Sequence, residues 1–149
     1  MNSIKKLLRS DRFRELFFYG VVGVITTLIN WGMYTAVSRA SAWILNISHE
    51  NAILIFIASA IGWAASVAFA FWANKKYVFR SPGWDASTLR RELPGFVTAR
   101  LLSLGFDTLF VEIAVHAAGM YDLLAKLIAN IIVIVLNYFA SKFWIFRKH

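Results

Sequence analysis

The chain has 149 residues, of which 59% are hydrophobic, 16% aromatic and only 16% charged. Soluble domains carry about a quarter charged residues, so this composition excludes an ordinary soluble domain. The formal net charge of +8 does not indicate a nucleic-acid partner, because the basic residues lie between hydrophobic blocks rather than on one soluble face. The sequence contains no cysteine, which excludes disulfides, thiolate metal sites and cysteine nucleophiles.

Four apolar runs are each long enough to cross a membrane as a helix, which takes about 20 residues. The runs cover residues 16–37, 52–73, 96–118 and 123–145. They lack the alternation of apolar and polar residues that a barrel wall requires. The sequence therefore predicts an all-α integral membrane protein with four transmembrane helices, in a single membrane domain over residues 1–149. Residues 80–93, which contain Ser81-Pro82-Gly83, are expected to form the only real linker.

The basic residues predict which ends of the helices face the cytoplasm. Of the 16 Lys and Arg residues, five precede the first run, six lie in the linker and its flanking helix ends, and three lie at the C-terminus. Only Arg39 and Lys126 belong to the other two loops. The positive-inside rule therefore predicts cytoplasmic N- and C-termini and a cytoplasmic linker. Alternatively, the basic lead and Ala40-Ser41-Ala42 mark the first run as a cleaved signal peptide, although it exceeds the apolar core of about 7–15 residues in such peptides.

The sequence also contains signs of an internal duplication. Arg14-Glu15-Leu16 recurs 77 positions later as Arg91-Glu92-Leu93, each time just before an odd-numbered run. The even-numbered runs end alike, in Asn74-Lys75-Lys76-Tyr77-Val78-Phe79-Arg80 and in Ser141-Lys142-Phe143-Trp144-Ile145-Phe146-Arg147. We expect two tandem helical-hairpin repeats, about 14–80 and 91–147, which are parallel because both enter the membrane from the same side. In this register Asn30 falls opposite Asp107.

Four segments carry a recognisable pattern: Phe17-Phe18-Tyr19-Gly20-Val21-Val22-Gly23, Thr27-Leu28-Ile29-Asn30, Asn74-Lys75-Lys76-Tyr77-Val78-Phe79 and Leu136-Asn137-Tyr138-Phe139-Ala140-Ser141-Lys142-Phe143-Trp144-Ile145-Phe146. With these segments the chain resembles the GtrA family over nearly its whole length. The resemblance implies a multi-pass protein of the bacterial inner (plasma) membrane that flips a polyprenyl-phosphate-linked monosaccharide for cell-surface polysaccharide synthesis. A separate glycosyltransferase would then use the sugar in the outer leaflet. Asn30 departs from the commoner family pattern, in which an acidic residue is frequent.

Ionisable and amide side chains inside the runs are candidates for function, because a charge at mid-bilayer costs at least about 2.5 kcal/mol. Arg100 and Asp107 are seven residues apart and share one face of the third run, with Ser103 between them. The fourth run carries one polar stripe, which consists of Lys126, Asn130, Asn137 and Ser141. A stripe of this kind faces protein or water rather than lipid.

Together these side chains predict a binding site for the substrate and its lipid phosphate along the inside of a bundle. The cations expected to collect the phosphate at the cytoplasmic side are Arg100, Lys75 and Lys142. Lys126 is expected to receive it on the far side. The residues expected to line the middle and bind sugar hydroxyls are Asp107, Asn30, Asn130 and Asn137. The candidate set is completed by Asn74 and Glu112.

A structural interpretation of the charged residues remains open. In it, Asp107 pairs with Arg100, and Glu112 pairs with Lys126, so that buried pairs hold the helices together. Glu112 also shares a helical face with His116, which indicates a second, outer cluster.

Residues near the helix ends, and small residues on the second run, have simple structural explanations. Basic side chains at helix ends reach out to lipid headgroups, an alternative that applies to Lys75, Lys142 and Arg100. An interfacial aromatic belt is expected from Trp72, Tyr77, Phe79, Trp144 and Phe146. Close helix packing is expected from Ala58, Gly62, Ser66 and Ala70, which recur every four positions. Residues 4–9 are expected to lie as a helix on an anionic leaflet.

We find no Gly-rich phosphate loop, no metal-spaced histidine cluster and no serine triad, so we expect neither an enzyme nor a cofactor. Because four helices enclose little volume and a sugar is bulky, a homodimer is expected, with the lipid tail left in the bilayer. Two alternatives to a flippase stay open. One is a small proton-coupled cation or drug exporter that works through Asp107 or Glu112. The other is a non-transporting scaffold for a membrane glycosyltransferase.

Overall fold

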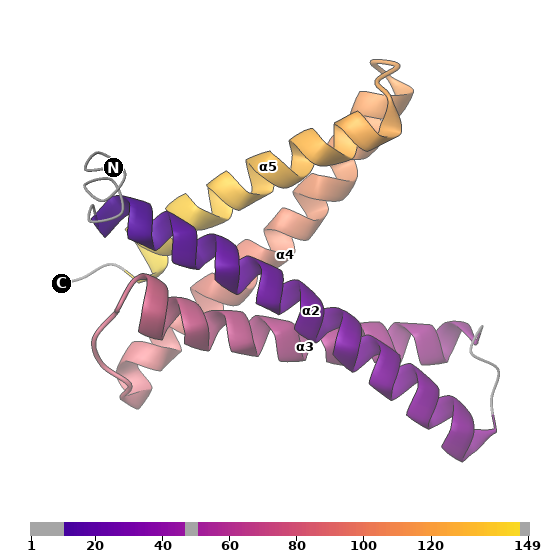
Figure 1. The fold of residues 1–149 in the computed structure, drawn as a ribbon, viewed down its shortest axis with the longest axis horizontal. Coiled ribbons are helices and arrows are strands. Elements are labelled where there is room, and N and C mark those ends of the chain that lie inside the picture. The colour runs from indigo at the N-terminus through magenta and orange to yellow at the C-terminus, as the bar shows by residue number, and fades with distance from the viewer. Residues whose placement is uncertain (1–10, 47–50, 147–149) are drawn as a thin grey trace, which may run out of the picture. The chain divides into compact units, whose positions relative to one another are not determined.

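The structure, a computed structural model, describes residues 11–46 and 51–146, and every regular element within these two ranges is a helix. The all-helical prediction is confirmed. The chain divides into two compact units, residues 1–80 and 81–149, and each unit contains one helical hairpin (Figure 1). The surface helix predicted at residues 4–9 lies outside the described residues. The single membrane domain and the repeat boundaries of about 14–80 and 91–147 stay predictions.

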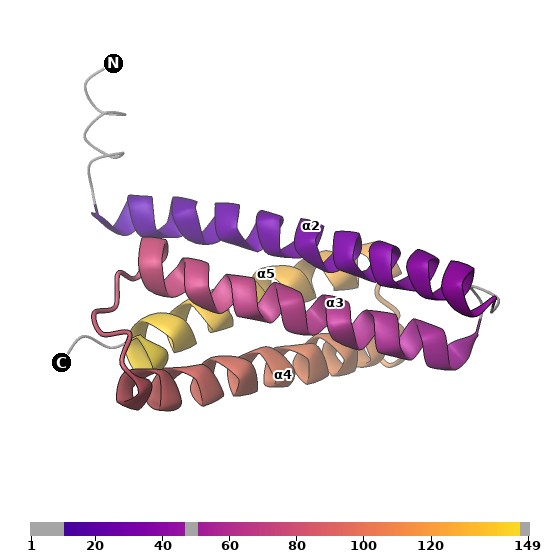
Figure 2. The same cartoon turned by 90° about the horizontal axis from the view of Figure 1, so that it is seen from below.

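The first hairpin consists of α2 (Asp11–Leu45) and α3 (Ala52–Ala73), which pack side by side (Figure 2). The 35 residues of α2 span roughly 52 Å at about 1.5 Å per residue. A hydrocarbon core is only about 30 Å thick, so α2 extends well past the predicted span of 16–37. The start of α3 is fixed by Asn51, whose Oδ1 accepts from the backbone N–H of Ile53 at 3.0 Å and of Leu54 at 3.2 Å.

Small residues on α3 let the two helices of this hairpin approach closely. The predicted packing stripe is confirmed, since its four members are buried: Ala58, Gly62, Ser66 and Ala70. A Cβ atom on Gly62 would lie 2.8 Å from Asn30 Oδ1 and 2.9 Å from the Asn30 carbonyl oxygen. The stripe therefore packs within the hairpin, against the middle of α2.

The second hairpin consists of α4 (Ala86–His116) and α5 (Asp122–Ala140). The predicted linker at 80–93 is wrong in its second half, because α4 already begins at Ala86. Asp85 caps this helix by accepting from the backbone N–H of Thr88 at 3.1 Å and from the side-chain hydroxyls of Ser87 and Thr88. These hydrogen bonds lower the pKa of Asp85 well below its ordinary value. The cap therefore persists at neutral pH and is lost only when strong acid protonates the carboxylate.

Removing this cap should loosen the first turn of α4. We expect Asp85→Ala to raise the hydrogen-exchange rates of the Thr88 and Leu89 amides, because their helix start loses its acceptor. Asp85→Asn keeps a capping oxygen and should leave these rates near those of the wild type. Equal exchange in the alanine variant would show that α4 starts without this cap.

Both hairpins end in a five-residue π-helix that directly continues their second helix. η1 (Asn74–Val78) follows α3, and η2 (Ser141–Ile145) follows α5. The amide of Phe79 donates to the Asn74 carbonyl at 2.9 Å, and the amide of Phe146 donates to the Ser141 carbonyl at 2.8 Å. The two similar sequence endings therefore adopt the same uncommon backbone.

A ring contact holds each π-helical end against the first helix of its own hairpin. Phe79 packs on Tyr19 with ring centroids 6.2 Å apart, and Phe146 packs on Phe96 at 5.9 Å. Tyr19 and Phe96 are 77 positions apart, the offset of the repeated Arg-Glu-Leu. Because both phenylalanines are buried, their assignment to an interfacial belt is wrong. The exposed members of the predicted belt are Trp72, Tyr77 and Trp144.

Within the described residues, three helical stretches are long and apolar enough to cross a membrane: Phe13–Leu45, Ala52–Val78 and Asp122–Ile145. By these criteria α4 is not a fourth, although it has 31 residues. Charged side chains such as Arg100 and Asp107 lower its mean hydropathy. The fourth span and the cytoplasmic location of the termini therefore stay predictions.

Candidate functional site

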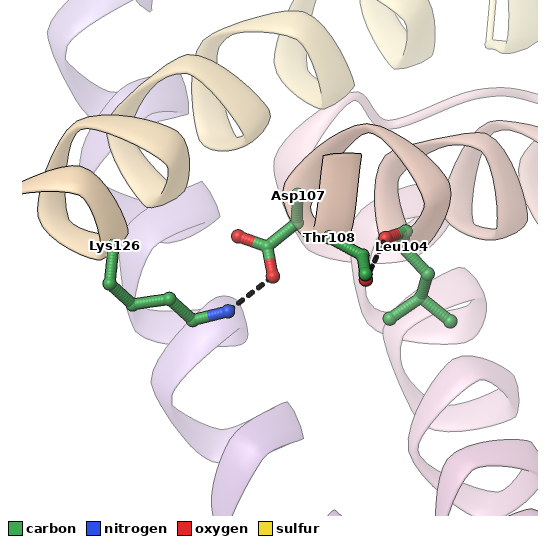
Figure 3. A network of polar contacts seen from close by, with 4 residues as sticks. All are labelled: Leu104, Asp107, Thr108 and Lys126. Atoms are coloured by element: carbon green, nitrogen blue, oxygen red, sulfur yellow. Dashed lines mark hydrogen bonds and ion pairs between the residues drawn. The ribbon is translucent and has the colours of Figure 1, made fainter. Parts of the chain in front are cut away.

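An ion pair joins the two helices of the second hairpin. Asp107 projects from α4 and Lys126 from α5, and the lysine ammonium donates to Asp107 Oδ2 (Figure 3). The Asp107 side chain is 19% exposed and the Lys126 side chain 50% exposed. In a low-dielectric environment such a pair is costly to separate, so it ties α4 to α5.

The second carboxylate oxygen of Asp107 lacks a donor. Its Oδ1 is buried and has no hydrogen-bond partner among the described residues. A buried acceptor without a partner costs about 1–3 kcal/mol and calls for an explanation. Asp107 is therefore both held in place by a cation and able to accept one more hydrogen bond.

The two ion pairs of the structural interpretation are wrong. Asp107 pairs with Lys126 rather than with Arg100, which lies two turns away on the same helix, about 10 Å at 1.5 Å per residue. Glu112 instead approaches His116, with Oε1 and Nδ1 3.5 Å apart, and both side chains are exposed. The predicted cluster of Glu112 and His116 is thus present, on the surface of α4.

A second polar contact between α4 and α5 involves Ser103 and Asn137. Ser103 Oγ lies 2.9 Å from Asn137 Oδ1 and 2.7 Å from the carbonyl oxygen of Ala99. The hydroxyl has one proton, which these two acceptors share or compete for. The buried Asn137 therefore has a defined place in the interface between the two helices.

The predicted polar stripe on α5 is buried at one end only. Asn137 and Ser141 are buried, whereas Asn130 and Lys126 are exposed. The expectation that the stripe faces protein or water rather than lipid stays a prediction for the exposed Asn130. Lys126 turns its ammonium to Asp107, so only the amide of Asn130 faces outward without a described contact.

Two of the candidate phosphate-binding cations rest on aromatic rings. The Arg100 guanidinium carbon lies 5.2 Å from the centroid of Phe96. Lys142 Nζ lies 5.4 Å from the ring centroid of Tyr138 and donates to its hydroxyl at 3.1 Å. Cation–π contacts hold both charges at defined positions. Sequence reasoning missed Tyr138, although a spacing of four residues on a helix is the signal for such a contact.

A buried carboxylate at the start of α4 was also missed. Glu92 is almost fully buried, and Ser81 Oγ donates to its Oε1 at 2.6 Å. The sequence did point to this residue, because Glu92 is the central residue of the repeated Arg-Glu-Leu. This contact anchors the segment before α4 to the helix itself.

In the first hairpin, the polar candidates lie at two separate levels. Asn30 is half-buried where α2 meets Gly62. Asn74 is fully buried at the start of η1, where its Nδ2 donates to the Ala70 carbonyl at 2.8 Å and its Oδ1 has no partner among the described residues. Lys75 is 0% exposed, so the expectation that it reaches lipid headgroups is wrong.

The described side chains offer cations, amides and the ion-paired carboxylate of Asp107. Within residues 11–46 and 51–146, no group of three His, Asp or Glu side chains forms a candidate metal site. The cations can bind a phosphate, and the carboxylate and amide oxygens can accept hydrogen bonds from sugar hydroxyls. Long apolar helices with such groups define the class: an α-helical integral membrane protein with polar contacts between its helices.

Comparison with known proteins identifies the family within this class. The family model "GtrA/DPMS, transmembrane domain" matches residues 18–146. The chain therefore belongs to the GtrA/DPMS transmembrane-domain family, and the resemblance seen in the sequence is confirmed.

Curated bacterial relatives match over most of their length. The cell wall teichoic acid glycosylation protein GtcA of Listeria monocytogenes is 35% identical, with 99% of this chain and 98% of the relative covered. The GtcA protein of Listeria innocua is 33% identical with the same coverage. The uncharacterized membrane protein YwcD of Bacillus subtilis is 34% identical over 87% of this chain and 94% of its own. No solved structure matches the chain significantly.

Proposed function

We propose that this protein acts in cell-envelope glycosylation by flipping a polyprenyl-phosphate-linked monosaccharide across the bacterial inner (plasma) membrane. Membership of the GtrA/DPMS family and the similarity to proteins named for teichoic acid glycosylation support a role in handling lipid-linked sugar. The structural observation that carries the flipping step is Asp107. Lys126 holds this carboxylate between two long helices, while its buried Oδ1 has no hydrogen-bond partner among the described residues.

The proposed path uses charge for the phosphate and neutral or paired groups for the sugar. Arg100 and Lys142 bind the phosphate at the cytoplasmic side, where Phe96 and Tyr138 hold their charges. Sugar hydroxyls then donate to the oxygens of residues on the second hairpin, namely Asp107, Asn137 and Asn130. Asn30, on the first hairpin, stays a separate candidate for binding sugar hydroxyls. Lys126 receives the phosphate on the far side.

Two further candidates take structural roles in this proposal. Asn74 and Lys75 are fully buried, so a ligand at the membrane surface does not meet them first. We assign them to the stability of η1 rather than to phosphate capture. The exposed Glu112 remains a candidate for the outer side, together with His116.

A homodimer and a separate glycosyltransferase complete the proposal. The amide of Asn130 is exposed on a helix apolar enough to span a membrane, and an amide facing lipid is costly. A second copy covers it and adds the volume that a sugar needs. The protein itself performs no chemistry, and the glycosyltransferase consumes the sugar on the outer leaflet.

The test uses purified full-length protein in proteoliposomes that contain a fluorescent prenyl-phosphate hexose. We expect the protein to speed the exposure of inner-leaflet probe to a membrane-impermeant quencher at least tenfold over protein-free vesicles. Asp107→Asn should slow this flipping by about tenfold or more, because losing one charged hydrogen-bond acceptor costs about 1.5–3 kcal/mol. Asp122→Asn, the same change on the exposed first turn of α5, is the matched control and should flip normally.

Other outcomes separate the alternatives. A rate equal to that of empty vesicles contradicts flipping, and restored glycosylation after adding a glycosyltransferase would then support a scaffold. Proton-driven uptake of a fluorescent cation without movement of the lipid probe would support an exporter.

A further inference from the structure

The C-terminal end of α2 carries an open groove that the proposed path does not use. Its volume is about 770 Å³, within the range of about 300–1,000 Å³ that is typical of small-ligand sites. All described lining residues lie between positions 34 and 46. The described lining of the groove therefore comes from the last turns of α2 and from Asn46, at the end of the hairpin opposite η1.

The groove has a floor of small side chains and walls of larger ones. Ser38 and Ala42 lie one helical turn apart and are both buried, so they form a low floor. Tyr34, one turn earlier on the same face, is half-buried beside this floor. The remaining lining residues are more exposed: Thr35, Arg39, Trp43 and Asn46.

Arg39 supplies a positive charge that no described residue of the hairpin neutralises. Its side chain is exposed, and it makes no ion pair or hydrogen bond with the described part of the chain. A guanidinium is always charged and presents five donors in a fork that fits a phosphate. The groove thus has one strong anion-binding group.

Trp43 supplies an aromatic face next to that charge. The residue is 86% exposed, so its indole is accessible from the groove. The C–H face of a hexose packs well on an indole, while its hydroxyls find partners in Thr35 and Asn46 across the groove. The combination fits a sugar that carries a phosphate better than a bare anion.

The distance along α2 sets the level of this groove relative to the lipid headgroups. Arg14 and Arg39 are 25 residues apart, or roughly 37 Å at about 1.5 Å per residue. A bilayer is about 40–45 Å thick including its headgroups. If Arg14 lies at one headgroup layer, Arg39 therefore lies at the level of the phosphates in the other.

We propose that the Arg39 groove binds a phosphate that carries a hexose, with Arg39 on the phosphate and Trp43 against the sugar ring. Its assignment as a second anion-binding site at the outer level, separate from Lys126, rests on the proposed function. The same chemistry occurs in a prenyl-phosphate hexose and in a water-soluble sugar phosphate.

The test follows each tryptophan separately by ¹⁹F NMR of 5-fluorotryptophan-labelled full-length protein in phosphatidylcholine nanodiscs. Titration with a ten-carbon prenyl phosphate that carries glucose should shift the Trp43 resonance. Trp31, which is exposed on the same helix outside the groove, is the internal control and should not shift. Arg39→Gln should raise the probe concentration for half-saturation at Trp43 about tenfold, and Arg39→Lys should raise it less.

Three comparisons make the result specific. Arg90→Gln removes the same charge from an exposed arginine of α4 and should leave the titration unchanged. The same prenyl phosphate without glucose should bind without moving the Trp43 resonance. Titration with glucose 1-phosphate shows where the ligand comes from. If it shifts the Trp43 resonance and Arg39→Gln weakens that shift, the groove binds a soluble sugar phosphate. If it leaves the resonance unmoved, the groove binds the lipid-linked form.

The proposed binding site would be contradicted if none of the three probes moved the Trp43 resonance. It would also be contradicted if Arg39→Gln gave the same half-saturation concentration as the wild type. An equal shift with the sugar-free probe would overturn the contact between Trp43 and the hexose. If the wild type flips the lipid probe while the groove shows one of these negative results, the proposed function stands and only the groove proposal fails. Conversely, an Arg39-dependent shift without flipping removes the proposed function and keeps the groove.

Discussion

Lys126→Met should nearly abolish flipping and destabilise the second hairpin, because it leaves the Asp107 carboxylate without its countercharge. Breaking a buried ion pair costs about 3–5 kcal/mol, and we expect the lower end because Lys126 is half-exposed. The free energy of unfolding in mixed micelles and the flipping rate measure the two effects in the same preparation.

The double variant Asp107→Asn/Lys126→Gln separates the two roles of the pair. It removes both charges, so stability should return to within about 1 kcal/mol of the wild type, since a matched pair adds little net stability. Flipping should stay low, because the neutral amide replaces the charged acceptor. Recovery of flipping together with stability would show that Asp107 serves only to hold α4 to α5.

Gly62→Val should separate the helices of the first hairpin. Even the first added carbon would lie 2.9 Å from the backbone carbonyl oxygen of Asn30 and 3.3 Å from the backbone nitrogen of Tyr34. The Asn30 side chain can rotate away, but the backbone of α2 cannot without moving the whole helix. Overpacking of this kind costs about 1–3 kcal/mol, which the free energy of unfolding would reveal.

Two glycines of α2 are matched controls for this substitution. An added Cβ meets nothing within 4 Å at Gly23 or at Gly32. Gly23→Val and Gly32→Val should therefore leave stability within about 0.5 kcal/mol of the wild type, as is usual away from packed contacts. If Gly62→Val were as stable as these controls, the close contact between α2 and α3 would not contribute to the stability of the hairpin.

The helices and their tight packing could be predicted from the sequence because each depends on a local pattern. Apolar length indicates the hairpins, and small residues at every fourth position predict that α3 packs closely. The start of α4 was missed because Pro94 and several charges resemble a linker. Asp85, followed three residues later by Thr88, is the capping signal that decides the boundary.

The polar contacts were harder to predict, because they depend on which side chain can reach across a helix pair. Sequence spacing placed Arg100 and Asp107 on one face, yet the long side chain of Lys126 reaches Asp107 from the neighbouring helix. The burial of Lys75 and Phe79 depends on the π-helical backbone of η1. The amino-acid composition of this segment does not predict a π-helix. The repeated endings were visible in the sequence, but not their π-helical turns.

Each π-helical end bears on how this chain evolved. Such a turn is closed by an i→i+5 hydrogen bond and so holds one residue more than an α-helical turn. Deleting one residue there would turn every later side chain by about 100°, and would turn Phe79 or Phe146 away from its ring partner. If the two hairpins descend from one ancestral hairpin, as the repeated Arg-Glu-Leu predicts, that single hairpin already had the π-helical end and the ring contact that both hairpins now share.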